Sequence, residues 1–195
     1  MTRDVQDLSR LQHLDRLPDL LRLIAANTSG ELVKAWFARH SGIPETSLPG
    51  HLEPLVTQCV IQTLPAWGDN PTKRVTGRPK ISLLDTVLAS RLNHVTPAAM
   101  APGAVSQAAG GLLESFGAAE FRRQPGWADT PAQLFHFRDR DDRELDIVLE
   151  TEGRCVAGVE PKAAGSVAKS DFEDSRSRVT SSRPVHPGSR PPHRD

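Results

Sequence analysis

The chain has 195 residues, enough for one domain of ordinary size or for two small ones. Its 24 Lys and Arg residues equal its 24 Asp and Glu residues, so no overall field draws it toward nucleic acid or a membrane surface. The two cysteines, Cys59 and Cys155, lack CxxC spacing, and no apolar run approaches the roughly 18 residues of a membrane span. These features argue against a disulfide-rich or membrane-spanning protein and predict a cytoplasmic one with no membrane partner.

Helical patterns dominate the first 60 residues. An aliphatic residue recurs every three positions over residues 5–17, and two further apolar stripes follow at residues 20–24 and 32–37. A fourth helix is expected within residues 43–60. Pro49-Gly50 should interrupt that helix, because proline and glycine disfavour a helix interior.

Two short apolar runs, at residues 60–64 and 81–84, predict a two-stranded wing. The loop between them carries four cations within eight residues, namely Lys73, Arg74, Arg78 and Lys80. Such cations can contact phosphates and give a non-specific, salt-sensitive affinity for DNA. A solvated loop is an equally good interpretation, because the rest of this half is acidic and no aromatic residue alternates with the cations to stack on bases.

The second half begins after a short helix that Asp85-Thr86 is expected to cap. Residues 93–109 are rich in Ala, Pro and Gly and predict a linker. A helix should then start near Gly111 and turn four apolar side chains inward: Leu112, Leu113, Phe116 and Phe121. Polar and apolar residues alternate from about residue 134 to 162, which predicts a meander of three antiparallel strands.

The expected fold class is therefore α/β (α+β). A helical subdomain with a wing should cover residues 1–95, and a helix followed by an antiparallel sheet should cover residues 96–172. From about residue 173 the composition changes to Ser, Arg, Pro and His, which cannot form an apolar core. We therefore expect residues 173–195 to be a disordered basic tail.

A possible catalytic group lies on the last two predicted strands. If residues 152–154 form the loop, position 151 pairs with 155 and Asp146 lies opposite Glu160. Opposed side chains have Cβ atoms roughly 4.5–5.5 Å apart, so the two carboxylates repel unless a cation lies between them. Asp146 and Glu160 are thus candidate ligands for Mg²⁺ or Mn²⁺, with Lys162 as a charged helper and Glu114 as a third carboxylate. The alternative is an ordinary half-exposed hairpin, on which acidic and aliphatic residues also alternate.

The order of short motifs over residues 3–172 resembles one particular family. The chain is similar to the winged-helix plus restriction-endonuclease-like domain found behind the AAA ATPase module of many prokaryotic ATP-binding proteins, a domain of unknown function. The motifs that carry the resemblance are Arg3-Asp4-Val5, Leu64-Pro65-Ala66-Trp67, Asn70, Lys73-Arg74, Pro79-Lys80, Asp85-Thr86, Gly111-Leu112-Leu113-Glu114, Phe137-Arg138, Glu144-Leu145-Asp146 and Glu160-Pro161-Lys162-Ala163.

The resemblance implies a nuclease-like signature with catalytic positions at Glu114, Asp146, Glu160 and Lys162. Pro161 departs from the family pattern, because a β-branched residue usually stands there and proline removes an N–H from the strand. Val87 stands where the family often has glycine. No GxxxxGK[ST] loop is present, so this chain is expected to bind no ATP, and the family's ATPase module would precede Met1.

Three functions are compatible with this pattern. The favoured one is a non-catalytic C-terminal module of a prokaryotic AAA-type ATP-binding protein, contacting DNA or a partner such as a separate ATPase-module polypeptide. The second is a nuclease that depends on Mg²⁺ or Mn²⁺. The third is a truncated gene remnant, because the pattern of the family is expected to end after Asp171-Phe172.

Overall fold

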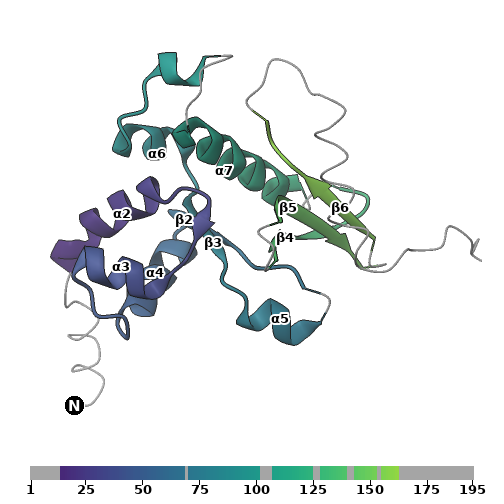
Figure 1. Cartoon of the computed structure of the whole chain (residues 1–195), viewed down its shortest axis with the longest axis horizontal. Coiled ribbons are helices and arrows are strands. Elements are labelled where there is room, and N and C mark those ends of the chain that lie inside the picture. Colours follow the sequence, from purple (N-terminus) through teal and green to yellow (C-terminus); the bar gives the residue numbers. More distant parts are fainter. Residues whose placement is uncertain are drawn as a thin grey trace, which may run out of the picture.

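The computed structural model describes residues 14–68, 70–101, 107–124, 128–139, 143–152 and 155–162. Helices are combined with two antiparallel sheets of three strands each, which confirms the α/β (α+β) class (Figure 1). The predicted basic tail, residues 173–195, and most of the first predicted helix lie outside the described residues. Among the described residues, no helix combines the length and the apolar character needed to cross a bilayer.

The first part of the chain alternates helices with the strands of one sheet. Its elements are η1 (Leu14–Arg16), α2 (Leu17–Ala26), β1 (Gly30–Glu31), α3 (Lys34–Ser41), α4 (Leu48–Thr57), β2 (Ile61–Leu64), α5 (Pro71–Thr76), β3 (Lys80–Leu83), α6 (Thr86–Leu92) and η2 (Pro97–Met100). The strands are ordered β1-β3-β2, and both pairings are antiparallel. The two predicted strands are therefore present as the antiparallel pair β2 and β3, with β1 added at the far side of β3.

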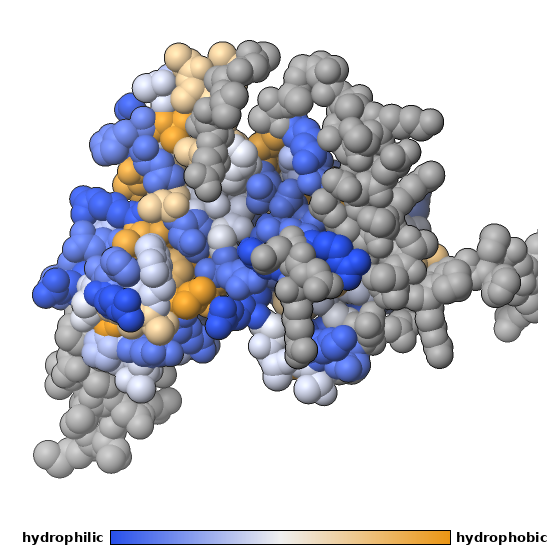
Figure 2. All heavy atoms as spheres, viewed as in Figure 1, coloured by the Kyte–Doolittle hydropathy of each residue, from blue (hydrophilic) through white to orange (hydrophobic). Residues whose placement is uncertain are grey.

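Helices α2, α3 and α4 pack with this sheet around one apolar core. Leu20, Ile24, Phe37, Leu48 and Leu83 are completely buried there. The helix ends follow ordinary capping rules: Gly42 closes α3 with a left-handed φ of 71°, and Asp85 accepts hydrogen bonds from the backbone of Val87 and Leu88 at the start of α6. The face of the molecule in Figure 2 is mainly hydrophilic, with apolar residues in small groups.

The expected break at Pro49-Gly50 is wrong, because α4 runs through both residues. Pro49 occupies the first turn, where a backbone N–H has no partner within the helix in any case. Pro54 also lies inside the helix, and both it and Gly50 face solvent, so water can satisfy the carbonyl that Pro54 leaves without a donor. The buried side chains Leu48 and Leu52 hold the other face of α4 against the core.

The connection between β2 and β3 is also more ordered than a loop. Asn70 caps α5 by accepting a hydrogen bond from the backbone N–H of Lys73 at 2.8 Å, and Pro71 starts the helix. The segment before it pairs with the second sheet, since Trp67 donates its backbone N–H to the His136 carbonyl at 2.6 Å and His136 donates to the Pro65 carbonyl at 2.9 Å.

The second part contains α7 (Gln107–Arg123), β4 (Ala132–Arg138), β5 (Glu144–Thr151) and β6 (Val156–Val159). The sheet order β4-β5-β6 confirms the predicted meander. The register expected from a turn at residues 152–154 is also confirmed, because Ile147 pairs with Val159 and the Thr151 N–H donates to the Cys155 carbonyl at 3.0 Å. The expectation that Phe116 points inward is wrong, because its side chain is half exposed.

Helix α7 connects the two parts of the chain (Figure 1). Leu112 belongs to the core of the first part, whereas Ala118 packs with Ile147 of β5. Polar contacts add to this packing: Ser29 Oγ donates to the Gly111 carbonyl at 3.1 Å, and Gln62 Nε2 donates to the Ser115 carbonyl at 3.0 Å. The expected subdomains therefore meet along α7 and share buried contacts.

Replacing Gly111 with alanine should weaken this junction. A Cβ at Gly111 would lie 2.8 Å from the Thr28 carbonyl oxygen, whereas a Cβ at Gly110 would have no neighbour within 4 Å. We expect Gly111→Ala to lower the free energy of unfolding by about 1–3 kcal/mol, as overpacking usually does. Gly110→Ala, in the same helix, should raise it by up to about 1 kcal/mol because alanine favours the helix.

Thermal unfolding followed by circular dichroism distinguishes the two variants. Equal melting temperatures for Gly111→Ala and Gly110→Ala would show that α7 does not pack against the Thr28 turn in solution.

Candidate functional site

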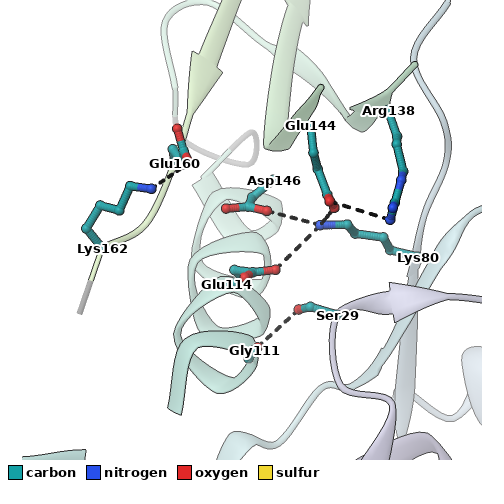
Figure 3. Close-up of polar contacts among 9 residues, drawn as sticks. All are labelled: Ser29, Lys80, Gly111, Glu114, Arg138, Glu144, Asp146, Glu160 and Lys162. Atoms are coloured by element: carbon teal, nitrogen blue, oxygen red, sulfur yellow. Dashed lines mark hydrogen bonds and ion pairs between the residues drawn. The ribbon is translucent and has the colours of Figure 1, made fainter. Parts of the chain in front are cut away.

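Three carboxylates converge on one buried lysine where β3, α7 and β5 meet (Figure 3). Lys80 Nζ lies 2.8 Å from Glu144 Oε1, 3.1 Å from Asp146 Oδ1 and 3.5 Å from Glu114 Oε2. The Lys80 side chain is only 7% exposed. We call these four residues, Lys80, Glu114, Glu144 and Asp146, the Lys80 cluster.

Ordinary strand and helix geometry explains how the cluster forms. Glu144 and Asp146 are two positions apart on β5, so their side chains lie on the same face of the sheet. Glu114 reaches this face from α7, which packs on β5 through Ala118 and Ile147. Lys80 begins β3, all four residues of which are buried. The ammonium thus comes from one sheet and two of the carboxylates come from the other.

The ammonium of Lys80 remains charged in this environment. Burial by itself lowers the pKa of Lys80, but the carboxylates of Asp146, Glu144 and Glu114 outweigh that effect and raise it overall. Glu144 also lies within 3.6 Å of the Arg138 guanidinium, so two cations serve this group of acids.

Glu114 is the unusual member of the cluster. Burial, followed by the negative charge of Asp146, raises the pKa of Glu114 to about 7, although the Lys80 ammonium opposes the shift. When Glu114 is protonated, Lys80 and Arg138 balance the charges of Glu144 and Asp146. Charge balance in a half-buried site therefore favours a neutral Glu114 at about pH 7 and below.

As arranged, the cluster does not fit a divalent metal ion. The position at which three carboxylates converge is held by the Nζ atom of Lys80, which donates protons and cannot be a ligand while charged. Among the described residues, no group of three or more His, Cys, Asp and Glu side chains has the geometry to hold a metal. Beside the cluster is a small cavity of about 10 Å³, room for one water molecule, whose lining combines Leu64 and Ala118 with Gln62, Glu114 and Asp146.

The four residues of the nuclease-like signature separate into two groups. Glu114 and Asp146 meet in the Lys80 cluster, but Lys162 Nζ donates to Glu160 Oε1 at 2.6 Å after the end of β6. Figure 3 shows this pair to one side of the cluster, with the Lys162 ammonium directed toward Glu160. The β5–β6 ladder ends at Ile147 and Val159, just before Pro161, which has no N–H to extend it. Lys80, not Lys162, is the cation beside Asp146.

Two of the four cations expected to contact nucleic acid are occupied within the protein, which corrects that expectation. Lys80 is buried in its cluster. Arg74 makes a two-pronged ion pair with the buried Glu150, at 2.6 and 2.9 Å, and its guanidinium lies 5.0 Å above the Phe135 ring. Burial of Glu150 makes a cationic partner necessary, so Arg74 is positioned by β5 and not by a ligand. Arg78 is exposed and lies 3.8 Å from Glu31, and Lys73 is exposed on α5.

Lys80 and Glu144 were not among the residues expected to lie beside Glu114 and Asp146. A signal existed in part: Glu144 and Asp146 are two positions apart on β5, and carboxylates on a largely buried strand require cations. Nothing local identified which of the 24 Lys and Arg residues would supply them.

Comparison with known families separates the chain where the predicted linker lies. A family model described as a domain of unknown function (DUF8612) matches residues 1–99, which is more than half of the chain. The chain belongs to this family. A second model, also described as a domain of unknown function (DUF4143), matches residues 109–188. This match extends beyond Phe172, so the expected end of the family pattern after Asp171-Phe172 is wrong. No curated protein and no solved structure gives a significant match.

The residues of the Lys80 cluster come from both matched regions. The DUF8612 region supplies Lys80, and the region that matches DUF4143 supplies Glu114, Glu144 and Asp146. The same holds for the second buried ion pair, in which Arg74 comes from the DUF8612 region and Glu150 from the other. In both cases a cation from the DUF8612 region neutralises acids of the region that matches DUF4143.

Removing the ammonium should destabilise the protein strongly. Lys80→Met leaves three carboxylates without their shared cation, and we expect a loss of about 3–5 kcal/mol in the free energy of unfolding at pH 8. The loss should be smaller at pH 5, because protonation relieves the repulsion. The control is Lys34→Met, which removes an exposed lysine at the start of α3.

Urea unfolding at the two pH values provides the measurement. The second substitution Asp146→Asn, added to Lys80→Met, should recover part of the loss. A Lys80→Met protein as stable as Lys34→Met at pH 8 would rule out the cluster.

The raised pKa of Glu114 predicts a pH dependence of stability. Since this carboxyl binds its proton more tightly in the folded state, its contribution is complete below about pH 4.5 and is lost as the pH rises through about 7. A shift of this size corresponds to a loss of up to about 3 kcal/mol. Glu114→Gln, which stays neutral, should therefore be more stable than the parent at pH 8 and nearly equal to it at pH 4.5.

The control for this effect is Glu53→Gln, on the exposed side of α4. Its difference from the parent should not change with pH. The interpretation fails if Glu114→Gln differs from the parent by the same amount at pH 4.5 and pH 8.

Proposed function

We propose that this chain is a non-catalytic C-terminal module of a prokaryotic AAA-type ATP-binding protein, and that it works by contacting a partner protein. The observation that carries the proposal is the position of Lys80 Nζ, which lies among three carboxylates that include Glu114 and Asp146 of the nuclease-like signature. The DUF4143 match supports the AAA connection, because this domain is commonly found in proteins associated with AAA ATPases. A separate ATPase-module polypeptide is the partner that this assignment suggests.

The order of elements supports a winged-helix assignment for the first part. The sequence α2-β1-α3-α4-β2-β3, with the antiparallel order β1-β3-β2, is what a three-helix domain with a wing requires. Helix α7 with the meander β4-β5-β6 supports an endonuclease-like framework for the second part. In the proposal, both frameworks serve as scaffolds.

A partner protein fits the surface better than DNA does. In a winged helix, α4 would approach the major groove, yet its exposed residues include Glu53 and no Lys or Arg. Of the cations near the wing, Arg74 and Lys80 are engaged with buried carboxylates. Near β2 and β3, within the part of the chain that the structure describes, this leaves few cations to neutralise phosphates, and such neutralisation provides most of the affinity of non-specific DNA binding.

A metal-dependent nuclease is the second candidate, favoured by the meeting of Glu114 and Asp146 beside a small cavity. This function requires that Lys80 leave the cluster and that Glu160 turn toward Asp146. Both movements would break ion pairs, those of Lys80 and that between Lys162 and Glu160. The cost of exposing the buried carboxylates is the physical reason for ranking this candidate second.

Calorimetric titration with Mn²⁺ tests the proposal. We expect the parent protein and Asp146→Asn to give the same negligible heat at millimolar Mn²⁺, because Lys80 already compensates the charge of Asp146. Glu160→Gln should behave identically. Saturable Mn²⁺ binding by the parent that Asp146→Asn abolishes would overturn the non-catalytic assignment in favour of the nuclease.

A further inference from the structure

Exposed apolar side chains from three elements gather at one groove. Val87 of α6 is 70% exposed, Met100 of η2 is 49% exposed and Phe116 of α7 is 50% exposed. All three line a groove with a volume of about 530 Å³, in the range of ligand-binding sites. In Figure 2, apolar surface is visible over α6 and η2.

The groove has an apolar floor that is continuous with the core. Leu112 lies beneath it and belongs to the core of the first part, and Leu113 and Val95 complete the floor. Phe116 is one helical turn beyond Leu112 on α7, so both lie on the same side of the helix. Contiguous apolar surface of this kind on a monomer marks a site that another molecule covers.

One charged residue, Arg91, indicates which charge a molecule bound in the groove should carry. Arg91 is the only ionisable residue among those that line the groove, it is exposed, and it makes no ion pair with the residues that the structure describes. A carboxylate on the occupant would pair with Arg91 at the edge, while apolar side chains fill the interior. The remaining polar groups at the rim, Thr86, Ser90 and Thr96, are uncharged.

A second copy of this chain is a poor occupant. Two identical grooves facing each other across a twofold axis are both concave, and they would bring Arg91 toward Arg91. A nucleic acid is also a poor occupant, because the groove carries a single cation. A convex segment with apolar side chains and an acid satisfies both the shape and the charge.

We propose that the groove formed by α6, η2 and α7 binds a short amphipathic segment of a partner protein, through two or three apolar side chains and a carboxylate that pairs with Arg91. The inference rests on the proposed function, since it gives the partner-binding module its contact surface. Phe116 and Met100 receive the apolar side chains of the segment.

The test uses a random library of 12-residue peptides displayed on phage and selected on the full chain. Enriched peptides should carry apolar residues at a spacing of three or four and at least one Asp or Glu. Synthetic copies should bind in fluorescence anisotropy, and Phe116→Ser and Arg91→Glu should each weaken binding at least tenfold. Replacing the acid of the peptide with lysine should restore binding to Arg91→Glu.

The matched control is Val75→Ser, which removes an apolar side chain that is 84% exposed on α5, outside the groove, and should leave affinity unchanged. Circular dichroism of each variant checks the fold. If no peptide is enriched, or if neither Phe116→Ser nor Arg91→Glu changes the affinity, the groove is not a binding site for such a segment. Mn²⁺ binding that depends on Asp146 would instead overturn the proposed function, so the two failures are distinguishable.

Discussion

Carboxylates gathered inside a protein require cations, and in this chain one ammonium lies within ion-pair distance of three of them. Lys80 contacts Glu114, Glu144 and Asp146 from the opposite side of the junction between the two sheets. A buried charge without a partner is costly, so while the two parts stay packed together the acids and the lysine each need the other. The cluster therefore joins the two parts and at the same time occupies the centre at which chemistry would take place.

Other polar contacts also cross the junction. Arg74 approaches Glu150 from α5, and in the opposite direction Arg122 of α7 donates to the Thr63 carbonyl of β2 at 2.7 Å. With the junction held in this way, α7 extends past the core of the first part and leaves Phe116 beside α6. The same packing that brings the acids of the Lys80 cluster together thus leaves an apolar groove between α6, η2 and α7.

Local structure was accessible from the sequence where it depends on neighbours along the chain. Apolar periodicity located α2 and α3, Asp85 marked the cap of α6, and the turn predicted at residues 152–154 specified which residues of β5 and β6 are paired. Such features depend on a few adjacent residues, so a linear pattern contains them. Proline was less informative: Pro49 indicated a break but lies in the first turn of α4, because position within a helix decides what a proline costs.

By itself the sequence determined the fold class, the order of the strands in the meander and the acids that line one face of β5. Only the tertiary structure decided which cations those acids receive, since Lys80 and Arg74 are more than 60 residues away from their partners on β5. It also decided that Lys162 pairs with Glu160 and that Phe116 remains half exposed. The reason is physical: charge pairing and burial depend on distance in space, and a sequence in which Lys and Arg equal Asp and Glu in number allows many pairings, of which packing selects one.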